Sequence, residues 1–169
     1  CISDNGENVI RKELGKYFYI KKGSIGPPDV YLGNKVSKVT LDNGVEAWSF
    51  SSCQYIRSVI NNVEKQLALQ NKTLPKRCTS PITRDYRPEL DITPELGIKD
   101  ISCYQSLIGI LRWIVELGRF DITTEVSLLS FCMALPRQGH MDQLLNIFGY
   151  LKIHDNAEIV FDPSEPDID

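Results

Sequence analysis

Two pairs of side chains and one glycine-containing segment in this sequence are of the types that perform catalysis or bind phosphate. Asp121 and Glu125 are four residues apart, a spacing that places two carboxylates on one face of a helix. Both would lie in the first helical turn, where the helix dipole favours acidic side chains, and Asp121 is a suitable N-cap. We therefore interpret this pair as residues that begin a helix, not as a catalytic acid and base.

The second pair, Cys132 and His140, would need an exposed thiolate and a third, orienting group to act as a nucleophile and its base. Cys132 lies within an apolar helical pattern and His140 precedes a helix, positions that indicate packing and capping. Residues 23–26, Gly-Ser-Ile-Gly, lack the Lys-Ser/Thr pair of a phosphate-binding loop and lead into two prolines. The residues themselves thus indicate no self-sufficient active site.

The composition narrows the class of protein. The five cysteines are far apart and form no C-x-x-C motif, and the sequence has only two histidines, so we expect no metal site. No apolar run approaches the roughly 20 residues of a membrane span, and no secretory signal is visible. We therefore expect an intracellular protein that is not secreted and has no membrane partner. Because the chain starts at Cys1 in the middle of a pattern, we expect a fragment of a longer reading frame.

The net charge of −3 conceals two segments of opposite sign. Residues 64–87 contain six basic and two acidic side chains, whereas residues 155–169 contain six acidic ones and no Lys or Arg. Basic residues also flank the aromatic residues of the N-terminal third; they are Lys16, Lys21, Lys22, Lys35 and Lys38. Interleaved aromatic and basic residues suit nucleic acid, through stacking and phosphate neutralisation. The alternatives are an ordinary solvated linker and lysines that protect exposed strand edges.

The N-terminal third is predicted to contain one helix and three extended segments. A modest apolar stripe predicts a helix over residues 4–16, and the aromatic, β-branched run after it predicts a strand over 16–20. A second extended region covers residues 30–41. Asn43-Gly44 then predicts a hairpin with a two-residue type I′ turn, which would place Val39 opposite Trp48.

Helical periodicity dominates the remainder. An amphipathic helix is predicted over residues 53–70, with Ser51 or Ser52 as its cap. Residues 72–98 contain four prolines and no sustained periodicity, and we expect them to separate two lobes.

Three further helices are predicted between Tyr104 and Lys152, joined by short breaks. Ser102 and Gln105 fit a capping box at the start of the first helix. A short strand is predicted over residues 157–161. The predicted fold is α+β, with four consecutive regions: residues 1–50, 51–71, 72–98 and 99–169.

Ordered motifs along almost the whole chain resemble the reverse transcriptase of copia-type (pseudovirid) LTR retrotransposons. In order, they are Tyr31-Leu32-Gly33, Gln54-Tyr55, residues 104–111 (YQSLIGIL), Arg119-Phe120-Asp121-Ile122, Pro136 with His140, and Tyr150-Leu151-Lys152. Each motif is modest, and their order and spacing together are specific. The family usually has Thr-Arg-Pro-Asp where this chain has residues 118–121, Gly-Arg-Phe-Asp, which loses a rigid helix start and keeps the Asp.

The resemblance implies a piece of a polymerase that begins just downstream of the family's Tyr-x-Asp-Asp motif, whose carboxylates bind the catalytic metal ions. That motif is absent from this sequence, so we expect no catalytic residue and no cofactor in this chain, and Mg²⁺ in the full polymerase. Residues 1–50 would be the end of the palm with a primer-grip-like hairpin, and residues 51–71 a thumb helix. Residues 72–98 would be a connection, and residues 99–169 a helical thumb and connection lobe with an acidic tail.

The resemblance also assigns roles to individual residues. The turn Tyr31-Leu32-Gly33 and the hairpin would hold the 3′ end of the primer, and a missing Cβ at Gly33 would let another backbone approach closely. The expected nucleic-acid-binding residues are Tyr31, Leu32, Gly33, Lys21, Lys22, Lys35 and Gln54. Arg119, Asp121 and His140 are expected to fix the entry and packing of helices.

The function implied is to grip a template–primer duplex, RNA–DNA or DNA, for synthesis by the full polymerase within its polyprotein. We do not expect this chain to polymerise alone. The expected setting is a cytoplasmic particle or the nucleus. A different class of function stays open: a helical protein-interaction module without a nucleic-acid role, built on the helices of residues 104–152.

Overall fold

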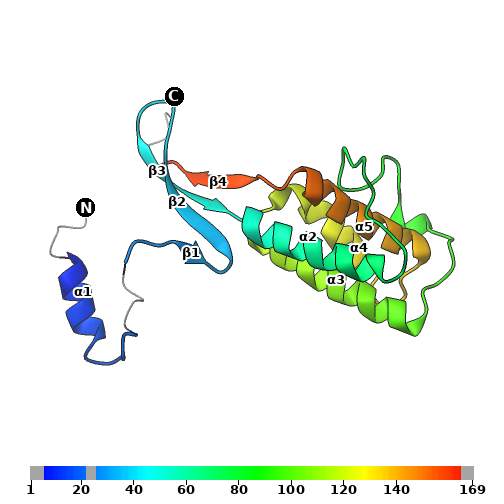
Figure 1. Cartoon of the computed structure of the whole chain (residues 1–169), viewed down its shortest axis with the longest axis horizontal. Helices are drawn as coiled ribbons and strands as arrows, with labels where there is room; N and C mark the ends of the chain where they lie inside the picture. Colours follow the sequence, from blue (N-terminus) through cyan, green and yellow to red (C-terminus); the bar gives the residue numbers. More distant parts are fainter. Residues whose placement is uncertain (1–5, 22–25, 165–169) are drawn as a thin grey trace.

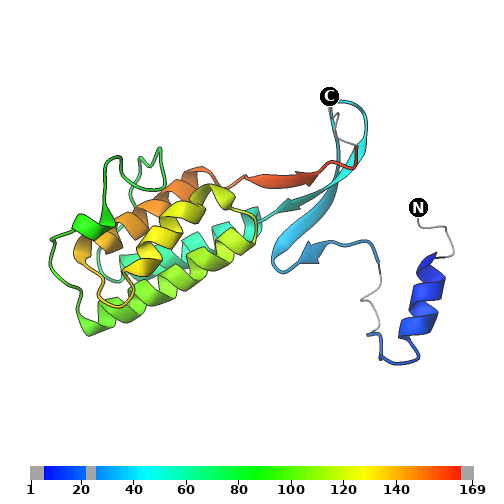
Figure 2. The ribbon, with the colours of Figure 1, turned by 180° about the vertical axis from the view of Figure 1, so that it is seen from behind.

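The structure is a computed structural model that describes residues 6–21 and 26–164. Its described elements, in chain order, are α1 (Gly6–Leu14), β1 (Val30–Tyr31), β2 (Asn34–Thr40), β3 (Glu46–Ser51), α2 (Cys53–Ala68), η1 (Pro88–Leu90), α3 (Ile98–Glu116), η2 (Phe120–Ile122), α4 (Thr123–Phe131), α5 (Gln138–Ile153) and β4 (Glu158–Phe161). Figures 1 and 2 show a helical bundle, a sheet that projects from one end of it, and α1 apart from both. The predicted α+β class is confirmed.

The first predicted strand is wrong. Residues 16–18 instead form turns that close the end of α1, where the amides of Tyr17 and Phe18 donate to the carbonyl of Leu14 at 3.1 and 2.9 Å. Tyr17 and Tyr19 are 80% and 91% exposed. A strand needs a hydrogen-bonded neighbour. The described strands pair only with one another, so residues 16–20 have no strand with which to pair. The predicted helix is confirmed within the described residues.

The four strands form one antiparallel sheet in the order β1-β2-β3-β4. The hairpin at Asn43-Gly44 is confirmed, but its register is shifted by one residue. Gly44 donates to the carbonyl of Leu41, and Leu41 donates to that of Val45, which leaves a three-residue loop. Among these loop residues only Gly44 has a positive φ, of 81°, so the turn is of the type that ends in a single left-handed residue.

The shifted register changes the neighbours of Trp48. Val39 pairs with Ala47, and Trp48 pairs with Lys38, whose Nζ lies 5.6 Å from the centre of the indole ring. This distance suits a cation–π contact. On the other side of β3, Trp48 pairs with Phe161 of β4. The predicted short strand near the C-terminus is therefore confirmed, and it is an edge strand of the same sheet.

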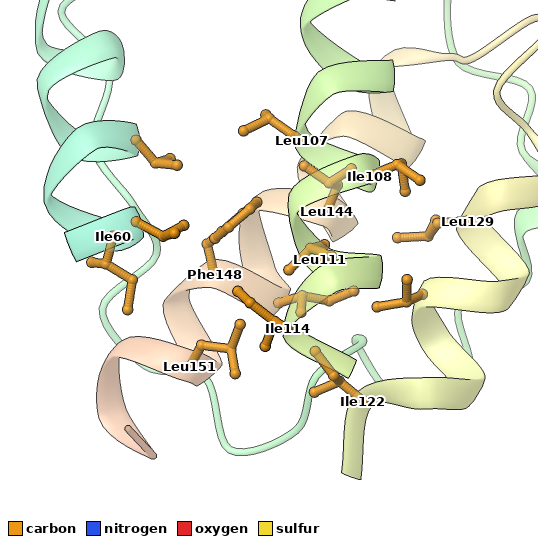
Figure 3. Packing of buried hydrophobic residues seen from close by; sticks show 14 of the residues in the cluster. Ile60, Leu107, Ile108, Leu111, Ile114, Ile122, Leu129, Leu144, Phe148 and Leu151 are labelled. Atoms are coloured by element: carbon orange, nitrogen blue, oxygen red, sulfur yellow. The ribbon is translucent and has the colours of Figure 1, made fainter. Parts of the chain in front are cut away.

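One apolar cluster holds α2, α3, α4 and α5 together (Figure 3). Helix α2 buries Ile56, Val59, Ile60, Val63 and Leu67, which recur at helical spacing on one face. Leu107, Ile108, Leu111 and Ile114 of α3 and Leu144, Ile147, Phe148 and Leu151 of α5 complete the centre of the cluster. The predicted amphipathic helix is confirmed. Ser52 lies at the N-cap without a side-chain hydrogen bond, and Ser51 Oγ accepts a long hydrogen bond, of 3.5 Å, from the amide of Cys53.

Helix α3 begins four residues before the predicted capping box. Ser102 lies inside the helix, where its hydroxyl donates to the carbonyl of Ile98, and Gln105 donates to the carbonyl of Met133. Gly97 is the N-cap. Cys132, expected to pack within an apolar helix, is only half-buried, as is Cys103, and the four described cysteines are free thiols.

Residues 72–98 form a long irregular segment that lies against α5. Leu74 and Cys78 are buried, and the side chains of α5 bind the segment's backbone: Gln143 Oε1 accepts from the amide of Thr83 at 2.8 Å, and Asn146 donates to the carbonyls of Ser80 and Pro81. Helix α2, before this segment, and α3, after it, share the cluster described above.

Gly149 lets this segment approach α5, and its replacement tests that packing. A Cβ at Gly149 would lie 2.6 Å from Cys78 Sγ and 2.8 Å from the carbonyl oxygen of Pro75. Gly149→Ala should therefore lower the free energy of unfolding by about 1–2 kcal/mol, as overpacking outweighs the better helix propensity. Gly109→Ala, where a Cβ meets nothing within 4 Å, should raise it by up to about 1 kcal/mol. Urea unfolding measures both, and equal shifts of the same sign would contradict the packing argument.

Candidate nucleic-acid interface

The segment Tyr31-Leu32-Gly33-Asn34 is a tight turn between β1 and β2. Tyr31 pairs with Asn34, and the two residues between them have positive φ angles, 53° at Leu32 and 96° at Gly33. Positive φ at both central positions is the pattern of a type I′ turn. Leucine rarely adopts this conformation, which costs about 1–2 kcal/mol. The predicted continuous extended region over 30–41 is therefore wrong, because the turn divides it.

The turn is held against the helical bundle at two points. The Cα of Gly33 faces the ring of Tyr55 in α2, and an added Cβ would lie 3.6 Å from that ring. Asn34 is 94% buried, and its Nδ2 donates to the carbonyl of Leu117, the C-cap residue of α3, at 3.2 Å. Among the described residues, Oδ1 of Asn34 has no hydrogen-bond partner. The turn thus lies in a fixed place between the start of α2 and the end of α3.

The outer side of the turn is open to solvent. Tyr31 and Leu32 are 60% and 59% exposed, although both are apolar or aromatic. Lys35 is exposed one residue after Asn34, and Gln54 is exposed beside Tyr55 in the first turn of α2. Because Tyr31 pairs with Asn34 and Lys35 pairs with Val30, the side chains of Tyr31 and Lys35 leave opposite faces of this two-stranded ladder. The turn thus has an aromatic ring, an apolar side chain, an amide and a positive charge exposed around it.

The structure places Tyr31, Leu32 and Gly33, three of the residues predicted to bind nucleic acid, in one turn. The turn residues and Lys35 are contiguous, and Gln54 adjoins them through the contact between Gly33 and Tyr55. Lys21 is exposed in an irregular segment between α1 and β1, and Lys22 lies outside the described residues. Sequence reasoning missed Asn34, whose only signal was an amide side chain within an otherwise extended run.

Arg119 joins the end of α3 to the end of α5. Its guanidinium is 1% exposed and donates to both carboxylate oxygens of Asp121, at 2.8 and 2.7 Å, and to the carbonyl of His154 at 2.6 Å. Tyr150 Oη donates to the same carboxylate. The expected side-chain cap by Asp121 is wrong, because Ile122 is the N-cap of α4 and Asp121 lies in η2. Hydrogen bonds from Arg119 hold the pKa of Asp121 below its usual value.

His140 binds the irregular segment to the start of α5. Its Nδ1 accepts a hydrogen bond from the amide of Arg137 at 3.0 Å, in a capping box, and Nε2 lies 3.0 Å from the carbonyl of Pro88. Since an amide can only donate and a carbonyl can only accept, this arrangement requires a neutral ring with its proton on Nε2. Both ring nitrogens of this buried side chain are engaged.

These contacts leave neither of the two pairs first considered for catalysis in a reactive arrangement. The carboxylate of Asp121 is neutralised by Arg119, and burial raises the pKa of the Cys132 thiol, which favours the unreactive thiol form. Within the described ranges, no group of three His, Cys, Asp or Glu side chains could hold a metal ion. None of the helices in those ranges combines the length and apolar character needed to cross a membrane.

Comparison with known proteins gives one informative similarity. The chain is 29% identical over 143 residues to the putative transposon Ty5-1 protein of Saccharomyces cerevisiae, a match that covers 84% of this chain and 41% of that protein. The chain thus spans about two-fifths of the length of this relative. The sequence matches no family model and the fold matches no solved structure. The similarity suggests a retrotransposon-derived origin.

The network around Arg119 predicts a pH-dependent contribution to stability. Asp121→Asn should lower the free energy of unfolding at pH 7 by about 2 kcal/mol, because it removes the anionic partner of a buried guanidinium. The folded-state pKa of Asp121 is below the unfolded value of about 3.9. This stabilisation is therefore present above about pH 4 and is lost as pH falls through the folded pKa.

Urea unfolding of both proteins between pH 7 and pH 2.5 measures this effect. The difference between the wild type and Asp121→Asn should shrink at the acidic end. Glu125→Gln, in the neighbouring first turn of α4, provides the control and should change stability by no more than about 0.5 kcal/mol. A difference that is constant across the pH range would exclude the ionised Asp121 as its source.

Proposed function

We propose that this chain is a fragment of a copia-type retrotransposon reverse transcriptase, in which it grips the template–primer duplex. The observation that carries the proposal is the turn Tyr31–Asn34, fixed between α2 and α3 with two apolar side chains exposed. The ordered motifs and the similarity to a transposon protein over most of the chain support the same origin.

A turn of this kind is suited to holding a nucleic-acid strand. Its backbone is ordered before binding, because Asn34 is hydrogen-bonded to Leu117 and Gly33 packs on Tyr55, so binding does not carry the full cost of ordering it. The ring of Tyr31 offers a stacking surface, and Lys35 offers a charge for phosphate. In the proposal, these groups hold the 3′ end of the primer.

The remaining elements have positional roles in the same proposal. Helix α2, which starts beside the turn, follows the minor groove of the duplex, and α3 to α5 complete the thumb and connection. The Mg²⁺ ions for nucleotidyl transfer belong to carboxylates in another part of the full polymerase, within the polyprotein. The setting is intracellular, in a cytoplasmic particle or the nucleus.

One observation favours the alternative class, a helical protein-interaction module. Large apolar side chains are exposed along α3, η2 and α4; they are Trp113 (39%), Phe120 (68%), Leu128 (41%) and Phe131 (84%). Salt separates the two functions. Binding through phosphates weakens steeply between about 50 and 200 mM salt, whereas an apolar interface responds little.

Replacement of two glycines tests the grip directly. Gly33 and Gly44 both have positive φ, 96° and 81°, in two different hairpin turns of the same sheet. Alanine at either position strains the backbone by about 1–2 kcal/mol. Gly33→Ala should weaken binding of an RNA–DNA hybrid by about tenfold. Gly44→Ala should leave it within about twofold. Fluorescence anisotropy with a labelled hybrid, in a series from 50 to 200 mM salt, gives both affinities.

The proposal fails if the wild-type chain shows no affinity for the hybrid at low salt, or if both alanine variants bind equally. Primer extension provides a second check. The chain alone should extend no primer, and extension by purified chain would contradict an assignment that places the catalytic carboxylates elsewhere.

A further inference from the structure

The loop of the β2–β3 hairpin contains a dipeptide whose side chain and backbone can react with each other. Asn43 is followed by Gly44, and both residues are exposed. The carboxamide carbon of an asparagine can reach the nitrogen of the next residue, and a glycine has no side chain to hinder that approach. Asparagine is among the thermally labile residues of proteins. In the whole sequence only Asn5 and Asn43 precede a glycine.

The reaction is a deamidation through a cyclic succinimide. The nitrogen of Gly44 forms a bond to Cγ of Asn43, its proton passes through solvent to Nδ2, the bond from Cγ to Nδ2 breaks, and ammonia leaves. Water then adds to one of the ring carbonyls and opens the ring, to give either aspartate or isoaspartate. In isoaspartate the backbone runs through Cβ and Cγ. Water is the only co-reactant, and no group is oxidised or reduced.

The closed hairpin holds both reacting groups in other interactions. The amide of Gly44 donates to the carbonyl of Leu41 at 2.8 Å, and Oδ1 of Asn43 accepts from the amide of Val45 at 3.0 Å. The first hydrogen bond retains the proton that the nitrogen must lose, and the second fixes the orientation of the carboxamide. The reaction at Cγ therefore requires both hydrogen bonds to break.

The loop can open without the rest of the molecule. In both views it lies at the end of the sheet away from the bundle (Figures 1 and 2). The ion pair next to it, between Lys38 and Glu46, is exposed and adds little stability. Among the described residues, no atom lies within 4 Å of a Cβ built on Gly44, so water reaches the site. Local openings of this kind cost less free energy than global unfolding.

We propose that Asn43 is a deamidation site controlled by the hairpin, which reacts while the loop is open and whose isoaspartate product keeps the loop open. Isoaspartate adds one backbone atom between the carbonyl of Leu41 and the amide of Gly44, and it converts Oδ1 into a backbone oxygen. Both loop hydrogen bonds then lose their geometry. The aspartate product keeps Oδ1 as a carboxylate oxygen that accepts from Val45. The site is thus a one-way record of hairpin opening, and it does not depend on nucleic-acid binding.

Site-resolved mass spectrometry of the full 169-residue chain tests the proposal. The chain is kept at neutral pH in buffer and in guanidinium chloride that unfolds it, and the peptides that contain Asn5 and Asn43 are followed separately. Asn5 is a matched reference, because both sites read Asp-Asn-Gly. In denaturant the two should react within about twofold of each other, since an unfolded chain holds neither site closed. In buffer Asn43 should react roughly ten to a hundred times more slowly than in denaturant, because two hydrogen bonds must break first.

A pair of substitutions at Val45 isolates one of these hydrogen bonds. Val45→Pro removes the amide that binds Oδ1 of Asn43, whereas Val45→Ala keeps it. The ratio of the rate in buffer to the rate in denaturant should rise about tenfold in the proline variant and stay within about twofold in the alanine variant. Circular dichroism establishes that each variant is folded, and the comparison of the wild type in the two solvents decides the question if the proline variant is not.

Three results would overturn the proposal. Equal rates for Asn43 in buffer and in denaturant would show that the hairpin does not control the reaction. Modification of Asn5 but not of Asn43 in denaturant would exclude the site itself. Equal rate ratios for folded Val45→Pro and Val45→Ala would exclude the hydrogen bond to Oδ1 as the control.

The two products test the claim that the change is one-way. Asn43→Asp reproduces the aspartate product and should melt within about 1 °C of the wild type. Aged protein enriched in isoaspartate at residue 43 by ion exchange should melt about 2–4 °C lower. If the isoaspartate form melts with the wild type, the product does not keep the loop open and that part of the proposal is wrong.

Discussion

Antiparallel pairing between β3 and β4 brings the start of α2 and the end of α5 to one end of the bundle. Strand β3 ends at Ser51 and α2 begins at Cys53, while α5 ends at Ile153 and β4 begins at Glu158, so neither connection is long enough to place the helix ends elsewhere. Arg57 in α2 forms an ion pair with Asp155, just after α5, across this junction. The buried face of α2 then meets that of α5, and α3 fills the remaining side of the cluster.

Side chains from β2, from the segment after α3 and from β4 also meet at this junction. Asn34 binds the C-cap residue of α3, and Arg119, three residues beyond Glu116, binds the carbonyl of His154 at the end of α5. Ile159 of β4 packs over Gly118, where a side chain would collide with it. A turn, two helix ends and an edge strand therefore meet at one place, and the exposed surface proposed for the primer lies beside it.

Sequence patterns predicted the elements whose signals are local. The amphipathic spacing of Ile56, Val59 and Val63 determined α2, and Asn43-Gly44 located the hairpin. The predictions that were wrong concerned features that depend on partners distant in sequence or on one backbone angle. The aromatic run at residues 16–20 has strand propensity but no neighbouring strand, and propensity alone forms no ladder. The hairpin register shifted because Asn43 does not adopt the positive φ that a two-residue turn requires. The role of Asn34 could not be predicted, because its partner Leu117 is 83 residues away in the sequence.

The attachment of the turn has a mechanical consequence. The sheet and the bundle are connected by two short covalent links at one end, and Asn34 adds a third restraint beside them. Three restraints at one end resist a tilt of the sheet relative to the bundle, so the turn keeps its place between α2 and α3.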